Sequence, residues 1–212
     1  NFGKNSVALR ADLTKEAEVQ GLVGRANEKL GGPISCLINN ASIFEYDNIW
    51  TANRDSWDRH IESNLRSPLV LTQSFANQVP PAKSDENSEP LAQGLIINLI
   101  DQRVKKLTPE FTSYTIAKMG LWALTQTSAQ ALAPNIRVNA IGPGPTLRGA
   151  RQSEEHFESQ RKNTVLGRGS DPSEIVSAVG YLLDAKSVTG QLICVDGGQH
   201  LAWQTPDVQG VE

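Results

Sequence analysis

Tyr114 and Lys118 lie four residues apart in the segment SYTIAKMG, and the apolar run LIINLI (95–100), which precedes Tyr114, ends at Asp101. On a helix, positions i and i+4 share one face, so a phenol and an ammonium at this spacing can act on one substrate atom. A free phenol has a pKa of ~10, and a nearby cation favours its phenolate and brings that pKa toward neutral pH. The three residues predict a proton-transfer site, although a Tyr and a Lys at this spacing on a solvated helix face also arise by chance.

The segments that must position these residues are predicted strands that alternate with predicted helices. Short β-branched apolar runs alternate with longer amphipathic stretches, a pattern typical of βαβ units on a parallel sheet. Strands are expected at 6–14, 34–38, 95–100, 136–141 and 191–195, and helices at 15–30, 56–78, 112–133 and 171–184. Residues 80–93 predict a surface connection, and residues 145–170 predict an irregular cover over the substrate with one short helix. The pattern predicts one doubly wound α/β domain over residues 1–212.

Three of the predicted strands end in unusual sequences. The strand at 34–38 runs into Asn39-Asn40-Ala41-Ser42, the strand at 95–100 into Asp101, and the strand at 136–141 into Gly142-Pro143-Gly144-Pro145-Thr146. In an open parallel sheet, ligands bind beyond the carboxyl ends of the strands, where neighbouring loops converge. Asparagine amides and bare glycine backbone can approach a flat polar ligand. We therefore expect these loops to share one site with the Tyr/Lys helix.

Composition narrows the function classes. The chain has 212 residues, 39% hydrophobic, and a net charge of −3, so it offers no basic field for nucleic acid. No apolar stretch approaches the ~18 residues that span a bilayer, and the first residues do not resemble a signal peptide, which favours a cytoplasmic protein. Cys36 and Cys194 suggest small buried hydrophobes, and His60, His156 and His200 suggest ordinary histidines. No metal site is expected.

The whole set of motifs is similar to that of the short-chain dehydrogenase/reductase family, over essentially all of residues 6–201. The matching segments are ADL (11–13), NNAS (39–42), Asn64 in IESNL, YTIAK (114–118), RVNAIGPG (137–144) and VTGQLICVDGG (188–198). The resemblance implies a Rossmann-type fold. It also implies hydride transfer between a nicotinamide and a carbon centre, with the tyrosine moving the proton.

The resemblance further implies roles for individual residues. The implied cofactor-binding residues are Asp12 and Leu13 at the adenine, Asn40, Ala41 and Ser42 at its ribose side, Tyr114 and Lys118 at the nicotinamide ribose, and Pro143, Gly144 and Thr146 beside the nicotinamide. Asn64 should hold a water in the proton relay behind Lys118. Most of the family has serine where this chain has Asp101.

Asp101 changes the chemistry that the site favours. A serine hydroxyl can donate a hydrogen bond to a carbonyl oxygen, whereas an ionised carboxylate can only accept one. A carboxylate beside Tyr114 also raises the pKa of the phenol, and at ~4 Å and a dielectric of about 20 it contributes ~4 kcal/mol, so it could nearly cancel the effect of Lys118. Asp101, Tyr114 and Lys118 are therefore expected to move protons as a coupled set.

Aspartate at this position resembles the pteridine reductase-like branch of the family, which includes bacterial dihydromonapterin reductases. Ser42 stands where the broader family usually has glycine, and Phe44 falls where this branch stacks the pterin against the nicotinamide. A pterin is a flat heterocycle with several N–H donors, which suits an aromatic face and an acceptor carboxylate. Phe44 as an ordinary loop anchor and Ser42 as a simple small-residue replacement are the alternatives.

A second departure concerns the start of the fold. The family's glycine-rich phosphate loop should precede residue 1, and the chain begins at Asn1. In the family's strand order 3-2-1-4-5-6-7, residues 6–10 form the third strand, and two strands between it and 34–38 are missing, a gap of about 14 Å. The sequence therefore predicts that the first βαβα portion is missing from this chain. The residues that choose between NADPH and NADH would be missing with it.

Gly120 lies in the predicted Tyr/Lys helix beside Ala117 and Ala123, at a cost of about 1 kcal/mol relative to alanine. Such a small face permits close approach of another helix. By the resemblance it is a subunit interface of a homo-oligomer, a homotetramer, and packing within the monomer is the alternative.

The sequence as a whole predicts an oxidoreductase that uses NADPH, or NADH, on a C=N or C=O group of a small molecule, with a pterin as the expected substrate. Ser42, Phe44, Asp101 and Tyr114 are the expected substrate-binding residues. The alternatives are a general short-chain carbonyl or alcohol dehydrogenase, and a catalytically silent dinucleotide-binding regulator.

Overall fold

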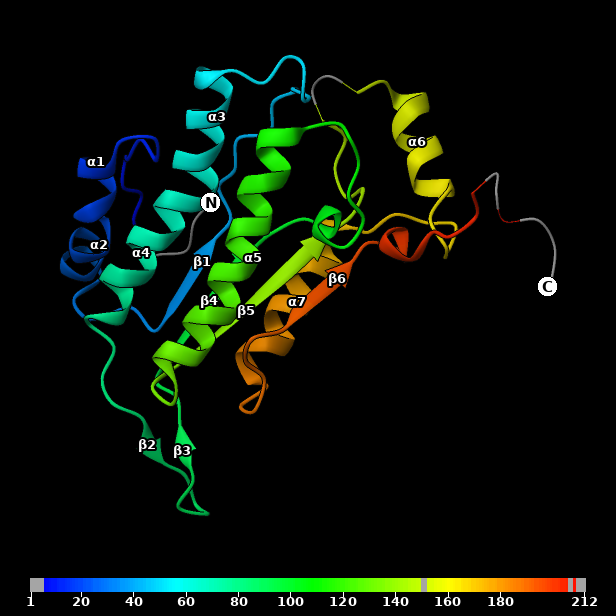
Figure 1. The fold of residues 1–212 in the computed structure, drawn as a ribbon. Coiled ribbons are helices and arrows are strands. Elements are labelled where there is room, and N and C mark those ends of the chain that lie inside the picture. Colours follow the sequence, from blue (N-terminus) through cyan, green and yellow to red (C-terminus); the bar gives the residue numbers. More distant parts are fainter. Residues whose placement is uncertain (1–5, 150–151, 206–207, 209–212) are drawn as a thin grey trace.

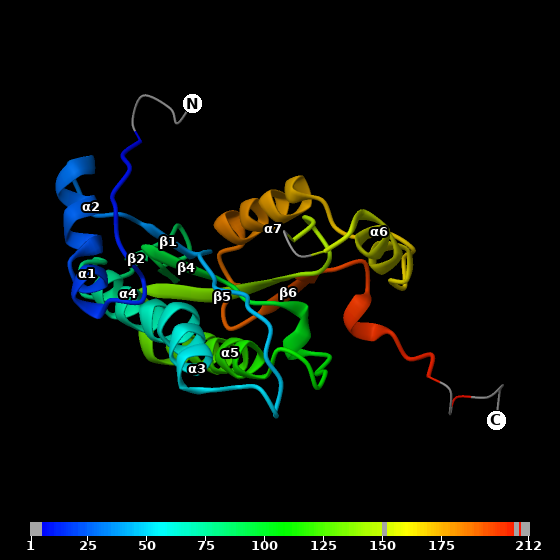
Figure 2. The ribbon, with the colours of Figure 1, turned by 90° about the horizontal axis from the view of Figure 1, so that it is seen from above.

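A parallel four-stranded sheet lies between two layers of helices in the computed structural model, which describes residues 6–149, 152–205 and 208 (Figures 1 and 2). The strands are β1 (Cys36–Asn39), β4 (Gly94–Leu99), β5 (Ile136–Pro143) and β6 (Leu192–Val195), and they lie side by side in that order. Every neighbouring pair is parallel. The predicted α/β class and four of the five predicted strands are confirmed.

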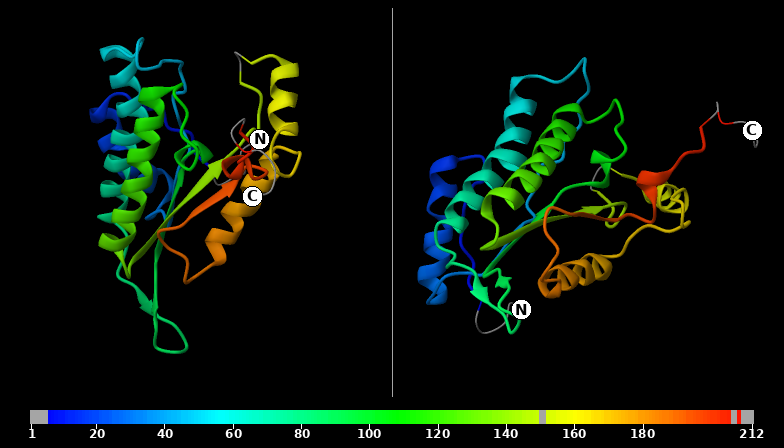
Figure 3. Two further views of the ribbon diagram at one scale, coloured as in Figure 1. Left: turned by 45° about the vertical axis from the view of Figure 1, so that its right-hand side comes forward. Right: turned by 60° about the horizontal axis from the view of Figure 1, so that its bottom comes forward.

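Helices cover both faces of this sheet. On one face lie α3 (Arg54–Ile61), the π-helical turn η1 (Glu62–Arg66), α4 (Ser67–Ala76) and α5 (Thr112–Leu132), and on the other lies α7 (Pro172–Asp184) (Figure 3). The short helices α1 (Glu16–Gln20) and α2 (Leu22–Leu30) pack beside α4, and α6 (Glu154–Lys162) lies beyond the carboxyl ends of β5 and β6. No helix in these described segments is both long and apolar enough to span a bilayer.

Strand β4 is the centre of the core because all six of its residues are buried. Since side chains alternate along a strand, Ile96 packs with Phe75 of α4 and Ala129 of α5, while Ile97 packs on the other face with Leu182 of α7. A sheet covered on both faces needs such a continuous apolar run, and LIINLI supplies it.

The predicted strand at 6–14 is wrong. Residues 6–12 form no strand, and β1 pairs with β4 alone among the described strands. A strand is stable only when a neighbour satisfies its backbone hydrogen bonds, and an apolar pattern cannot supply that neighbour. The predicted helix at 15–30 is two helices, since Gly21 lies between α1 and α2.

The predicted helix at 56–78 begins two residues earlier, at Arg54. The Asn53 side chain accepts a hydrogen bond from Ser56 N, and Ser56 Oγ accepts one from Asn53 N, which completes a capping box. The π turn η1 then divides this region into α3 and α4. Within the surface connection 80–93, the short strands β2 (Lys83–Ser84) and β3 (Pro90–Leu91) form a hairpin that points away from the sheet (Figure 1).

Gly120 packs inside the chain. A Cβ at position 120 would lie 2.7 Å from Leu65 Cδ2, so the glycine lets α5 approach η1 closely. This contact supports packing within the monomer, the alternative explanation of the small face. A homotetramer remains a prediction.

Candidate active site

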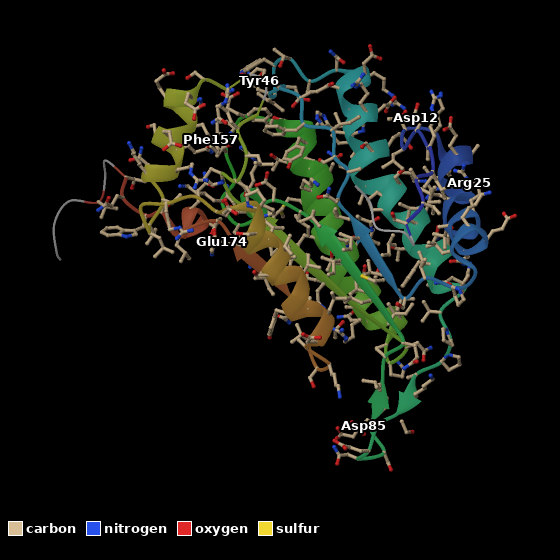
Figure 4. The ribbon with its side chains drawn as sticks, turned by 180° about the vertical axis from the view of Figure 1, so that it is seen from behind. Asp12, Arg25, Tyr46, Asp85, Phe157 and Glu174 are labelled. Carbon is tan, nitrogen blue, oxygen red and sulfur yellow. The ribbon has the colours of Figure 1, made fainter. Side chains whose placement is uncertain are left out.

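The carboxyl ends of β1, β4 and β5 bring most of the predicted site residues to one edge of the sheet (Figure 1). Strand β1 ends at Asn39 and is followed by Asn40, Ala41 and Ser42, which are exposed. Figure 4 shows Tyr46, in the loop after β1, at the end of the molecule opposite the hairpin tip at Asp85. The loops therefore converge on the amino-terminal end of α5, where Tyr114 lies.

Tyr114 and Asp101 are directly bonded. The Tyr114 hydroxyl donates to Asp101 Oδ2 over 2.9 Å, and Asp101 Oδ1 accepts from Arg103 N over 2.7 Å at the start of the 3-10 helix η2 (Gln102–Val104). Burial raises the pKa of Tyr114 well above 10, and the negative charge of Asp101 and its hydrogen bond raise it further. Arg103 and Ser42 lower this pKa by smaller amounts. The expected near-cancellation of charges is wrong, because burial adds to the effect of the carboxylate and the phenol stays protonated at neutral pH.

Lys118 is also buried at this edge. Its side chain is 2% exposed, Nζ donates to Leu99 O over 2.8 Å, and Nζ lies 5.7 Å from the centre of the Tyr114 ring. Burial lowers the pKa of Lys118 from 10.5 to about 8, while the charge of Asp101 opposes that change. Lys118 is therefore still mainly charged at pH 7. An ammonium has three N–H donors, so the bond to Leu99 leaves two for a ligand.

Asn64 holds the loop that follows β1. It lies in the π turn η1, its Oδ1 accepts from Ile43 N over 2.8 Å and from Ser42 Oγ over 3.2 Å, and its Nδ2 donates to Ile43 O over 2.8 Å. Both polar atoms of this buried amide are thus engaged by the loop. The side chain orients Ser42, and the role of Asn64 in a proton relay remains a prediction.

Phe44 lies against Tyr114, and its ring is partly exposed. Its ring contacts Tyr114 edge-on at 4.7 Å and stacks on Phe111 at 4.4 Å with 16° between the planes, and 46% of Phe44 is exposed. Phe111 has φ of 60°, in the left-handed region that a residue with a Cβ rarely adopts. Sequence reasoning missed Phe111, since no local pattern predicts this conformation.

The loop after β5 is held rigidly. Gly144 N donates to Val195 O over 3.0 Å, and a Cβ at position 144 would lie 2.6 Å from Asp196 Cα, so only glycine fits there. Thr146 Oγ1 donates to Gly144 O over 3.0 Å, and Arg161 of α6 donates to Pro145 O over 2.8 Å. Pro143, Gly144 and Thr146 therefore form a fixed wall beside the sheet edge.

The residues predicted to meet the adenine lie toward α1 and α2. Asp12 is beside α1 in Figure 4, where its Oδ1 accepts from Thr14 N and Oγ1 and its Oδ2 pairs with Lys15 at 3.3 Å. A pocket of about 250 Å³ lies nearby. It is lined mainly by apolar side chains, and among its residues are Leu13, Asn39, Asn40 and Ala41.

The structure also reveals a buried network that sequence reasoning missed. His60, Ser113 and Asp47 are almost fully buried, and Ser113 is hydrogen-bonded to both of the other residues. In the sequence, Asp47 follows Phe44 closely and Ser113 directly precedes Tyr114. The sequence suggested an ordinary role for His60, because the three histidines of the chain are isolated from one another in sequence. No spacing in the sequence joins Asp47, His60 and Ser113, which lie in three separate segments.

Comparison with known proteins places the chain in a family. A family profile described as enoyl-(acyl carrier protein) reductase matches residues 1–200. A short-chain dehydrogenase/reductase of Armillaria gallica is 28% identical, over 92% of this chain and 76% of its own length. The chain belongs to the short-chain dehydrogenase/reductase family and has that family's oxidoreductase fold.

Two solved structures are more similar. The structure of FolM alternative dihydrofolate reductase 1 from Brucella canis, complexed with NADP, matches with a TM-score of 0.85 and 46% identity. The corresponding protein from Brucella suis, also in complex with NADP, matches with a TM-score of 0.86 and 45% identity. Each alignment covers 95% of this chain and 76% of the other.

Proposed function

We propose that this protein reduces a pterin-like C=N or C=O substrate with NADPH. The observation that carries the proposal is the hydrogen bond from Tyr114 to Asp101 beside the ring of Phe44. A carboxylate accepts hydrogen bonds from N–H groups, and an aromatic ring favours a flat partner, so the two together favour a heterocycle over a simple ketone. The two Brucella proteins, described as dihydrofolate reductases complexed with NADP, support the same substrate class and cofactor.

The residues of this chain fit a dinucleotide. Leu13, Asn40 and Ala41 line an apolar pocket that suits an adenine, and Asn39 Oδ1 is a buried acceptor without a hydrogen-bond partner in the described structure. Lys118 has N–H donors left for the nicotinamide ribose, and Gly144 keeps the wall beside the nicotinamide free of a side chain. When bound, NADPH supplies the hydride.

Tyr114, Asp101 and Lys118 then manage the proton. The phenol is protonated at neutral pH, so it holds the proton that the reduced substrate atom needs. A phenol with a raised pKa cannot release its proton alone, so the charged Lys118 must stabilise the phenolate as it forms. Asp101 accepts the substrate's N–H groups and, with Phe44, fixes the plane of the ring.

Steady-state kinetics test the proposal. NADPH oxidation is measured with 7,8-dihydrobiopterin, quinonoid dihydropterin, 7,8-dihydrofolate and a panel of simple ketones. We expect kcat/KM to be higher for at least one pterin than for every ketone. Faster ketone turnover would instead identify a general carbonyl reductase, and NADPH binding without turnover on the whole panel would identify a silent regulator.

A further inference from the structure

A chain of buried hydrogen bonds links the loop of Phe44 to the helix of Tyr114. Glu45 N donates to His60 Nε2 over 3.1 Å, and His60 Nδ1 lies 2.7 Å from Ser113 Oγ. Ser113 Oγ in turn donates to Asp47 Oδ2, and Ser113 N donates to Asp47 Oδ1 over 3.1 Å. His60 belongs to α3, Ser113 to the first turn of α5 and Asp47 to the loop, so three separate segments meet here.

The partners determine where the proton of His60 lies. A backbone N–H can only donate, so Nε2 must be the unprotonated acceptor for Glu45. The proton of the neutral ring then lies on Nδ1 and points to Ser113 Oγ, and the serine hydroxyl points to the carboxylate of Asp47. Only this placement of the protons gives every donor in the network an acceptor. A protonated His60 would place an N–H on Nε2 directly against the N–H of Glu45.

This network lies directly beside the residues that carry the rings of Phe44 and Tyr114. Glu45 follows Phe44 in the chain and Ser113 precedes Tyr114. The rings of His60 and Tyr114 are 6.0 Å apart in an edge-on contact. Asp47 also fixes the strained Phe111, because Phe111 N donates to Asp47 O over 2.7 Å, and Phe111 stacks on Phe44.

We propose that neutral His60 is a positioning residue that holds Phe44 and Tyr114 in the relative placement needed for substrate reduction. The choice of a pterin as assay substrate rests on the proposed function, whereas the hydrogen-bond arrangement does not. Protonation of His60 breaks its bond to Glu45 and releases the loop, so the enzyme loses substrate affinity at acidic pH.

The surroundings of His60 keep it neutral. Burial lowers the pKa of His60 below 6.5, and the charge of Arg59 on the same helix lowers it further. Asp47 and Glu45 of the loop, and a backbone hydrogen bond at Ser56, oppose this change. From α5, the Ser113 hydroxyl and the Tyr114 ring face the imidazole, and both are uncharged at neutral pH.

The tautomer is tested first, in the unmodified protein and without any activity measurement. Imidazole ¹⁵N NMR of the three histidines should include a ring with its proton on Nδ1 whose signal disappears in His60→Gln. His200 also points Nδ1 at a carboxylate, Asp196, so the His60→Gln spectrum is needed for the assignment. A His60 signal with its proton on Nε2, or a His60 pKa above 6.5, overturns the proposal.

Kinetics test the positioning role. His60→Leu can form neither hydrogen bond of His60. It should raise the KM for the pterin about tenfold, a change of the size of one ordinary hydrogen bond. The KM for NADPH should change less than twofold. His60→Gln can still accept from Glu45, so it should retain wild-type kcat/KM at pH 7.5 within about threefold. It cannot be protonated, so the fall in kcat/KM below pH 6.5 should vanish.

Controls separate positioning from folding. His156→Gln changes an exposed histidine on α6 and should leave the pH profile unchanged. An acid limb in His60→Gln identical to that of wild type overturns the proposal, as does wild-type kinetics in a folded His60→Leu variant. If no pterin is turned over, the proposed substrate is wrong, and the NMR result still decides whether the proposed hydrogen bonds of His60 are present.

Discussion

Lys118→Met should abolish reduction and stabilise the fold at pH 7. Burial lowers the pKa of Lys118 from 10.5 to about 8, which corresponds to about 3 kcal/mol of unfolding free energy lost at neutral pH. Methionine removes this cost, but Leu99 O then loses its donor, at about 1 kcal/mol or more. We expect a net gain of about 1–2 kcal/mol in unfolding free energy, and at least a 100-fold loss of kcat.

The sign of the pH dependence makes this prediction sharp. Between pH 8 and 10.5 the unfolded chain binds more protons at Lys118 than the folded one, so wild-type stability should rise with pH through that window. Urea unfolding at pH 7 and pH 10, with a constant m-value, measures both proteins. The advantage of the variant should shrink or reverse at pH 10, whereas Lys105→Met, at an exposed site, should show neither effect. A variant less stable than wild type at pH 7, or a difference independent of pH, would refute the reasoning.

Three further substitutions test other parts of the site. Asp101→Ser should lower the pKa of Tyr114, seen by ultraviolet titration of the phenol, and should move the kcat/KM preference from pterins toward ketones. Phe44→Ala should raise the KM for the pterin about tenfold and change the unfolding free energy by only about 1 kcal/mol, since the ring is half exposed. Gly144→Ala should weaken NADPH binding at least about tenfold in a fluorescence titration, because its Cβ would collide with the backbone of Asp196.

The fold was predictable where the sequence pattern reflects burial on both faces of a sheet. LIINLI and IRVNAI became adjacent central strands because an apolar run of that length can be covered only by helices on both sides. Residues 6–14 show the same kind of pattern but form no strand, since strand formation depends on a partner that local sequence does not supply. The cap at Asn53 and the π turn η1 depend on side-chain contacts, so the boundaries around 54–66 were not predictable either.

The site was predictable only where residues are local to one element or end a strand. The contact of Asp101 with Tyr114 follows from a strand end facing the first turn of the next helix. The raised pKa of Tyr114 could not be predicted from the sequence, because spacing reveals neither how deeply the phenol is buried nor that Lys118 donates to Leu99 O. The network of Asp47, His60 and Ser113 joins three distant segments, which only the folded chain brings together.

Burial acts on the two central groups in opposite directions, and this has a consequence for the working pH. It raises the pKa of Tyr114 and lowers that of Lys118, because each shift favours the uncharged form. Below about pH 8 the phenol keeps its proton while Lys118 keeps its charge, which is the combination that the proposed reduction needs. We therefore expect the alkaline limb of the pH profile of kcat/KM to report Lys118 and not Tyr114. If His60 must also be neutral, as proposed above, we expect reduction within a pH window whose acid limit is set by His60 on α3 and whose alkaline limit is set by Lys118 on α5.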